Sequence, residues 1–232
     1  MSKNHTSPEK KEAIDPAQLK PGFELPKLTP EMQERMNKVQ KELDVFKEKV
    51  LAKRTDITGM SLLPPLQPQP LPPGVQRDPR DIPNPQDINI FILIDDAKLE
   101  GLAKGDLIVK STEETTKIAK ELNENFKPQV MLISELKEAC FDAKYDIIQM
   151  VANSGIFYDK GLLSALKVAE LHKNMATKKF DKYVVSYIAV GSLFRGDAAP
   201  NDIDVAIVID DTDVKKMSRF ELREKLRGII TS

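Results

Sequence analysis

Two aspartates, Asp202 and Asp204, stand at the start of the apolar run 205–209. Residues two apart in a strand project from the same face, so we expect the two carboxylates to lie close together. Two such charges about 4 Å apart repel by roughly 4 kcal/mol at an effective dielectric constant near 20, and a cation between them removes that cost. Hard cations such as Mg²⁺ bind carboxylate and phosphate oxygens. The spacing therefore predicts a metal site at Asp202 and Asp204.

A Gly-Ser pair lies ten residues before these acids. Gly191 and Ser192 follow the predicted strand 183–190, and a glycine there permits a tight turn into a short helix. Free backbone N–H groups at such a turn, together with the serine hydroxyl, suit an anion. The sequence thus places a predicted phosphate-binding turn and predicted metal-binding acids on neighbouring strands.

The combined pattern Gly-Ser-x-x-Arg-Gly followed by Asp-x-Asp resembles the signature of the DNA polymerase β-like nucleotidyltransferase superfamily, in its minimal form. The motif residues are Gly191, Ser192, Arg195, Gly196, Asp202 and Asp204. The resemblance implies transfer of a nucleoside monophosphate from an NTP, such as ATP or GTP, to an acceptor, with Mg²⁺ held by three carboxylates. It implies that Asp202 and Asp204 are catalytic metal ligands and that the other four residues bind the nucleotide, with the serine and its backbone holding the β- and γ-phosphates.

Two features depart from that pattern. The gap between Gly196 and Asp202 is one residue shorter than in many minimal members. The third carboxylate is expected on a later strand, beyond Ser232. Asp210 and Asp211 cannot replace it, because at 3.3 Å per residue they lie roughly 20 Å along the strand.

An internal repeat includes the acidic strand. Residues 87–96 read DINIFILIDD and residues 202–211 read DIDVAIVIDD, with six of ten positions identical. Each is preceded by a shorter match, ITGMSLL from Ile57 and IAVGSLF from Ile188. Each is followed by a predicted capping box that opens a helix, at 111–114 and 218–221. We interpret the pattern as two copies of one unit.

The first copy is predicted to be degenerate and free of metal. It has Met60-Ser61 at the position aligned with Gly-Ser, and Asn89 in place of the second aspartate. Its next predicted strand, Val130–Ile133 after Pro128, carries no acid. An amide oxygen carries no charge, so metal affinity at Asn89 is expected to be lost.

The predicted fold class is α/β (α+β), a mixed sheet with packed helices, nucleotidyltransferase-like. The predicted domains are a disordered tail at 1–28, a degenerate unit at 29–173 with a proline-rich loop at 64–87, and a partial unit at 176–232. Further elements are predicted by apolar periodicity and turn signals. They are strands at 56–63, 88–94 and 203–209 and helices at 111–125, 134–141, 143–153 and 162–173.

The partial unit is expected to need a covering partner. Ile207 and Ile209 point to one face of its acidic strand and Ala206 and Val208 to the other, so both faces are apolar. The helix from Ser218 can cover one of them. We therefore expect 176–232 to pack against the first copy, to dimerise through its open edge, or to be completed by a partner.

Composition narrows the class of protein. Lys and Arg total 35 against 36 Asp and Glu, for a net charge of −1, which argues against bulk electrostatic binding of nucleic acid. Cys140 is the single cysteine, so no cysteine metal cage forms, and neither His5 nor His172 has neighbours typical of a metal ligand. A hydrophobic signal core and a membrane span are missing from the sequence, which predicts a cytoplasmic protein with no membrane partner.

The acceptor stays open between a protein, a small molecule and RNA. Two alternative functions stand beside nucleotidyl transfer. One is a non-catalytic pseudo-enzyme that binds nucleotide or assists assembly. The other is an antitoxin-like protein that modifies or neutralises a partner.

Overall fold

The computed structural model describes residues 29–65, 83–97, 103–180, 183–191, 202–210, 212 and 216–230. The predicted tail 1–28 and most of the predicted proline-rich loop lie outside these ranges. The chain divides into two compact parts, Met1–Lys41 and Glu42–Ser232.

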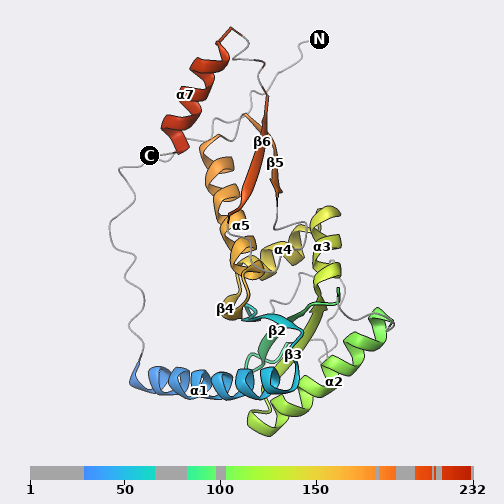
Figure 1. Cartoon of the computed structure of the whole chain (residues 1–232). Helices are drawn as coiled ribbons and strands as arrows, with labels where there is room; N and C mark the ends of the chain where they lie inside the picture. The colour runs from blue at the N-terminus through green and yellow to red at the C-terminus, as the bar shows by residue number, and fades with distance from the viewer. Residues whose placement is uncertain are drawn as a thin grey trace, which may run out of the picture. The chain divides into compact units, whose positions relative to one another are not determined.

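Helices and strands are interspersed along the described chain, so the predicted mixed α and β class is confirmed (Figure 1). The helices are α1 (Pro30–Lys53), α2 (Lys104–Leu122), α3 (Ile133–Phe141), α4 (Tyr145–Ala152), α5 (Leu162–Lys179) and α7 (Arg219–Ile230). The strands are β1 (Ile57–Leu62), β2 (Ile88–Ile94), β3 (Phe126–Leu132), β4 (Gly155–Asp159), β5 (Val184–Val190) and β6 (Asp204–Ile209).

Four strands form a mixed sheet in the order β3-β2-β1-β4. β1 runs antiparallel to both of its neighbours, β2 and β4, and β3 runs parallel to β2. The parallel pair is connected through α2, which packs along β3. The remaining strands, β5 and β6, form a separate antiparallel pair.

Three predicted boundaries in the first half were wrong. Pro128 lies inside β3, opposite Ile90; it is tolerated because β3 is an edge strand, where a missing N–H leaves no neighbouring strand unpaired. Ile133 begins α3 instead of ending the strand. Helix α2 begins at Lys104, and Ser111 is buried within it, where its hydroxyl donates to the Leu107 carbonyl oxygen at 2.6 Å.

Two further helices bear on the predicted boundaries. Helix α5 continues six residues past the predicted end at Lys173, to Lys179, so it passes through the proposed boundary between the copies. The capping serine of α7 is confirmed, because the Ser218 hydroxyl accepts a hydrogen bond from the Glu221 N–H at 3.1 Å.

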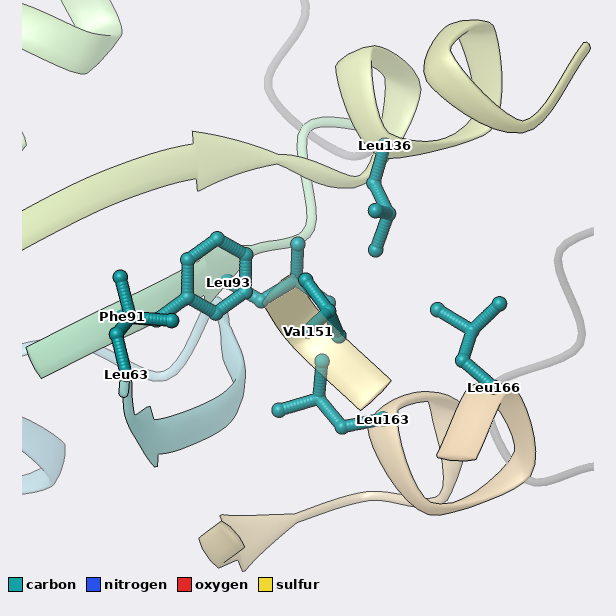
Figure 2. Close-up of a cluster of buried hydrophobic side chains, with 7 residues drawn as sticks. All are labelled: Leu63, Phe91, Leu93, Leu136, Val151, Leu163 and Leu166. Carbon is teal, nitrogen blue, oxygen red and sulfur yellow. The ribbon is translucent and has the colours of Figure 1, made fainter. Parts of the chain in front are cut away.

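Both faces of the β1–β2 hairpin are buried. On one face, Phe91 and Leu93 of β2 join Leu63 in a cluster with residues of α3, α4 and α5 (Figure 2). The helices contribute Leu136, Val151, Leu163 and Leu166. On the opposite face, Ile90, Ile92 and Ile94 have no exposed surface. Burial on both sides explains why β2 is apolar without interruption from Ile90 to Ile94.

The β5–β6 hairpin buries its two faces unequally. Side chains of β6 alternate between half-buried, at Val205, Ile207 and Ile209, and exposed, at Asp204, Ala206 and Val208. The exposed face also carries Ile188 and Val190 of β5, which are 45% and 40% exposed. Helix α5 contacts β5. No described helix is long and apolar enough to cross a membrane.

Replacing Phe91 by alanine should destabilise the chain by about 3–5 kcal/mol, the usual cost of removing a buried phenylalanine ring, because Phe91 is only 2% exposed. Phe220→Ala is the matched control, since that ring is 74% exposed and its loss should change stability by no more than about 0.5 kcal/mol. Urea unfolding followed by circular dichroism measures both. Equal effects of the two variants would contradict the described core.

Candidate functional site

The β5–β6 hairpin brings the Gly-Ser turn and the acidic strand together. Val190, the last residue of β5, pairs with Asp204, the first residue of β6. Gly191 follows directly and has a φ of +92°, a conformation that a residue with a side chain adopts only with strain. The predicted turn after β5 therefore begins at Gly191.

The carboxylate of Asp204 lies next to Gly191. A Cβ added to Gly191 would collide with the carboxylate of Asp204. The Asp204 carboxylate thus occupies the space that a side chain at position 191 would fill. The positive φ favours glycine at position 191, and the Asp204 carboxylate lies against the backbone where the predicted phosphate-binding turn starts.

The two predicted metal ligands are open to solvent. Asp202 and Asp204 are both exposed, so their oxygens are accessible to a cation and to the phosphates that accompany it. Within the described ranges there is no group of three or more His, Cys, Asp or Glu side chains that could hold a metal ion. Ser192, Arg195 and Gly196 lie outside the described residues, so the structure brings together Gly191 and Asp204 only.

Asp210, at the far end of β6, has a local structural role. Its carboxylate accepts hydrogen bonds from the Thr212 hydroxyl at 2.5 Å and from the Thr212 N–H at 2.9 Å. These two bonds hold the pKa of Asp210 below its usual value. The carboxylate therefore caps the turn after β6.

The two hairpins share one register. The ladder of the first hairpin begins with the pair Ile57↔Ile94, and that of the second begins with the pair Val184↔Ile209. In both hairpins an irregularity in the register follows immediately after this pair. From there the ladders run in step, so that Met60↔Ile92 corresponds to Tyr187↔Ile207 and Leu62↔Ile90 to Ala189↔Val205. One step further along the ladders, Leu63 and Asn89 of the first hairpin correspond to Val190 and Asp204 of the second. The Leu63 N–H donates to the Asn89 carbonyl oxygen at 2.9 Å.

This register corrects the sequence match before the acidic strands. Aligning Ile57 with Ile188 placed Met60-Ser61 opposite Gly191-Ser192, whereas the ladders place Pro64-Pro65 there. The short match ITGMSLL and IAVGSLF is thus out of register by four residues, because chance similarity between short apolar segments is common. The alignment of Asn89 with Asp204 agrees with the register.

The first hairpin holds a different set of polar groups at the equivalent position. Asn89 is 8% exposed, and its side-chain oxygen accepts a hydrogen bond from the Gln129 side chain at 3.2 Å. Asp87 forms an ion pair with Lys127 at 3.7 Å. The equivalent position of the first hairpin thus holds an ion pair, Asp87 with Lys127, and next to it a pair of amide side chains, Asn89 with Gln129. Neither Gln129 nor Lys127 was recognised in the sequence, because both depend on the parallel pairing of β2 with β3.

A second group of polar residues lies where α5 meets β5. His172, in the middle of α5, shares a hydrogen bond of 2.9 Å with the Tyr187 hydroxyl. Two residues earlier in α5, buried Glu170 pairs with Lys173 at 2.6 Å. Burial, and after it the negative charge of Glu170, raise the pKa of Tyr187. These residues fix α5 to β5.

Cys140 is half-buried, and burial raises the pKa of its thiol. A raised pKa disfavours the reactive thiolate. The side chain of Cys140 packs against the buried apolar cluster that contains Leu136 and Val151.

Comparison of the chain with protein-family models, with curated protein sequences and with solved structures found no match.

Replacing Gly191 by alanine should disrupt the turn, because a methyl group would meet the Asp204 carboxylate and the backbone has a positive φ. The positive φ alone costs an alanine roughly 1–2 kcal/mol. Amide hydrogen exchange of β5 and β6 should become about tenfold faster or more. The matched control is Gly105→Ala in α2, where an added Cβ meets nothing within 4 Å and exchange in β5 should not change. Unchanged exchange in Gly191→Ala would show that the contact is unimportant.

Proposed function

We propose that the β5–β6 hairpin carries an Mg²⁺-dependent NTP-binding site of the nucleotidyltransferase type. The observation that supports this most directly is the contact between Gly191 and the Asp204 carboxylate. With no side chain between them, a phosphate held by the turn reaches a metal held by the carboxylate. The residues that fit Mg²⁺ are Asp202 and Asp204, since both are exposed carboxylates and oxygen is its preferred ligand.

The chemistry proposed for this site is nucleotidyl transfer. An acceptor oxygen attacks the α-phosphorus, a new phosphorus–oxygen bond forms, and the bond from the α-phosphorus to the oxygen bridging the α- and β-phosphates breaks. Pyrophosphate leaves, and the acceptor's proton passes to solvent. Bound Mg²⁺ would neutralise phosphate charge during this reaction. The chain's own residues would hold the triphosphate at the turn after β5, where Ser192 and the backbone bind the β- and γ-phosphates, with Arg195 and Gly196 completing the nucleotide site.

One observation favours binding without turnover as a second candidate. Two-metal transfer in this superfamily is expected to use three carboxylates, and the described residues offer only Asp202 and Asp204 at this place. A site with two carboxylates retains ligands for Mg²⁺ and phosphate. The second candidate is therefore a pseudo-enzyme that binds NTP through the same residues.

We further propose that the β1–β2 hairpin belongs to a degenerate copy of the same unit. The shared register and the shared irregularity support a common origin for the two hairpins. In the first hairpin, Pro64 stands where Gly191 stands in the second, and Asn89 stands where Asp204 stands. Lys127 supplies a positive charge beside Asp87, so a metal ion there would meet repulsion as well as one carboxylate fewer.

The nucleotide proposal is tested by calorimetric titration of the chain with ATP and GTP, with and without Mg²⁺. Binding should require Mg²⁺, and Asp204→Asn should weaken it by about tenfold or more, equivalent to about 1.4 kcal/mol. The matched control is Asp210→Asn, an exposed acid of the same region whose carboxylate caps a turn; affinity should not change. Failure of ATP and GTP to bind at millimolar concentration would refute the site. Binding without transfer, detected as the absence of pyrophosphate release, would select the second candidate.

The degenerate copy is tested with Mn²⁺, whose anomalous scattering identifies it in a crystal. Density is expected at Asp202 and Asp204 and not at Asp87, because Lys127 lies 3.7 Å from that carboxylate and like charges at this range repel. Density at Asp87 comparable to that at Asp202 would overturn the interpretation. Lys127→Ala, soaked in the same way, separates repulsion by lysine from the loss of the carboxylate at position 89.

A further inference from the structure

A cavity of about 690 Å³ lies between β5 and the helices α3, α4 and α5. On the β5 side it is lined by six consecutive residues, Ser186–Gly191. Successive side chains of a strand point to opposite faces, so six consecutive residues meet the cavity along the edge of the strand. Within the described residues β5 is paired only with β6. The cavity therefore follows an edge of β5 that carries no described strand.

The first hairpin shows what this edge can hold. In β1 the edge opposite β2 is paired with β4, through Gly59, Met60, Ser61 and Leu62. The shared register makes these residues equivalent to Ser186, Tyr187, Ile188 and Ala189. All four of the latter line the cavity. The cavity thus lies along β5 where β4 lies along β1.

The opposite wall of the cavity is largely apolar. It includes Phe141, Tyr145, Ile148, Leu166 and Ala169, and the first two side chains are 76% and 58% exposed. The wall thus offers exposed aromatic surface at the place where an added strand would present its side chains.

The charges in this wall compensate each other. Glu170 and Lys173 are paired at 2.6 Å, and the Lys173 ammonium lies 5.5 Å from the centre of the Tyr145 ring. A segment with apolar side chains therefore suits this wall better than a charged one does.

We propose that this edge binds an extended segment of a partner protein, about five residues long, which adds as a third strand antiparallel to β5. Main-chain hydrogen bonds to β5 would provide affinity, and apolar side chains facing Phe141 and Tyr145 would provide selectivity. An unpaired strand edge is a template for such pairing. The inference depends on the register shared by the hairpins and not on nucleotide binding.

The probe is a fluorescein-labelled peptide with the sequence of residues 153–161, NSGIFYDKG, because β4 is the strand that fits the equivalent edge. The full chain should bind it saturably by fluorescence anisotropy, and the amides of 186–190 should exchange more slowly in its presence. The control peptide carries Tyr158→Pro, because Tyr158 pairs with Met60 in the β1–β4 ladder, whereas Phe157 lies at its irregularity. It should bind about tenfold more weakly, because proline removes a main-chain donor and one hydrogen bond contributes about 1 kcal/mol.

Two variants of the chain locate the peptide. Phe141→Ser, in the cavity wall, should weaken binding by about threefold or more, since an aromatic contact contributes roughly 0.5–1.5 kcal/mol. Phe220→Ser is the matched control, because that ring is equally exposed and does not line the cavity; it should bind the peptide as the unmodified chain does. Titration of Mg²⁺ and ATP into Phe141→Ser should give the unmodified affinity, so failure of this inference is separable from failure of the proposed function.

Several results would overturn the proposal. They are absence of saturable peptide binding, equal affinity of the proline peptide, and exchange protection outside 186–190. A concentration-dependent dimer that protects these amides would make a second copy of the chain the occupant. Displacement of the peptide by ATP, together with weaker ATP binding by Phe141→Ser, would assign the cavity to the nucleotide.

Discussion

The requirement to cover both faces of an apolar hairpin governs the arrangement of this chain. β2 is apolar at every position from Ile90 to Ile94, so it needs packing partners on both sides, and it has them. Helix α5 supplies part of one side through Leu163 and Leu166. The same helix reaches β5 through His172 and Tyr187. One helix therefore contributes to the packing of both hairpins, and the position of the second depends on the position of the first.

The two hairpins have the same backbone register but differ in how far their side chains are buried. The exposed positions of β6 carry small residues, Ala206 and Val208, where the matching positions of β2 carry the buried Phe91 and Leu93. At the end of that face, Asn89 is buried and hydrogen-bonded, whereas Asp204 is exposed. Burial and loss of charge occur together, because a bare carboxylate is costly to remove from water. At the second hairpin the carboxylate of Asp204 stays hydrated, because it is exposed.

Much of the secondary structure was predictable because apolar runs and turn residues are local signals. β1, β2, α3, α4 and β6 lie close to their expected positions. β4 was not assigned, since five residues give too short a pattern. The start of α2 was misplaced because the Ser111 hydroxyl donates to a carbonyl oxygen inside the helix instead of capping its end. The capping pattern in the sequence does not reveal whether further helical turns come before it. Pro128 was misplaced because edge position is a property of the whole sheet.

The candidate site was predictable only in part. Spacing alone suggested Asp202 and Asp204 and placed Gly191 before them. The contact of Gly191 with Asp204 could not be predicted, since it depends on the register of β5 against β6. The same reason explains why Pro64 was missed as the counterpart of Gly191. Gln129 and Lys127 escaped notice because they reach β2 from a strand more than thirty residues away, across α2.

The lysine beside Asp87 has a consequence for how the first hairpin responds to its surroundings. An ion taken from solution occupies its site to an extent set by its concentration, whereas a charge attached to the chain is present at a fixed local concentration. The Asp87–Lys127 pair is partly exposed, and such pairs add little to stability. Its charge balance nevertheless persists in the presence of chelators and when cellular metal levels fluctuate. If the proposed function holds, the first hairpin would not respond to metal supply, whereas the carboxylates of the second hairpin would respond to it.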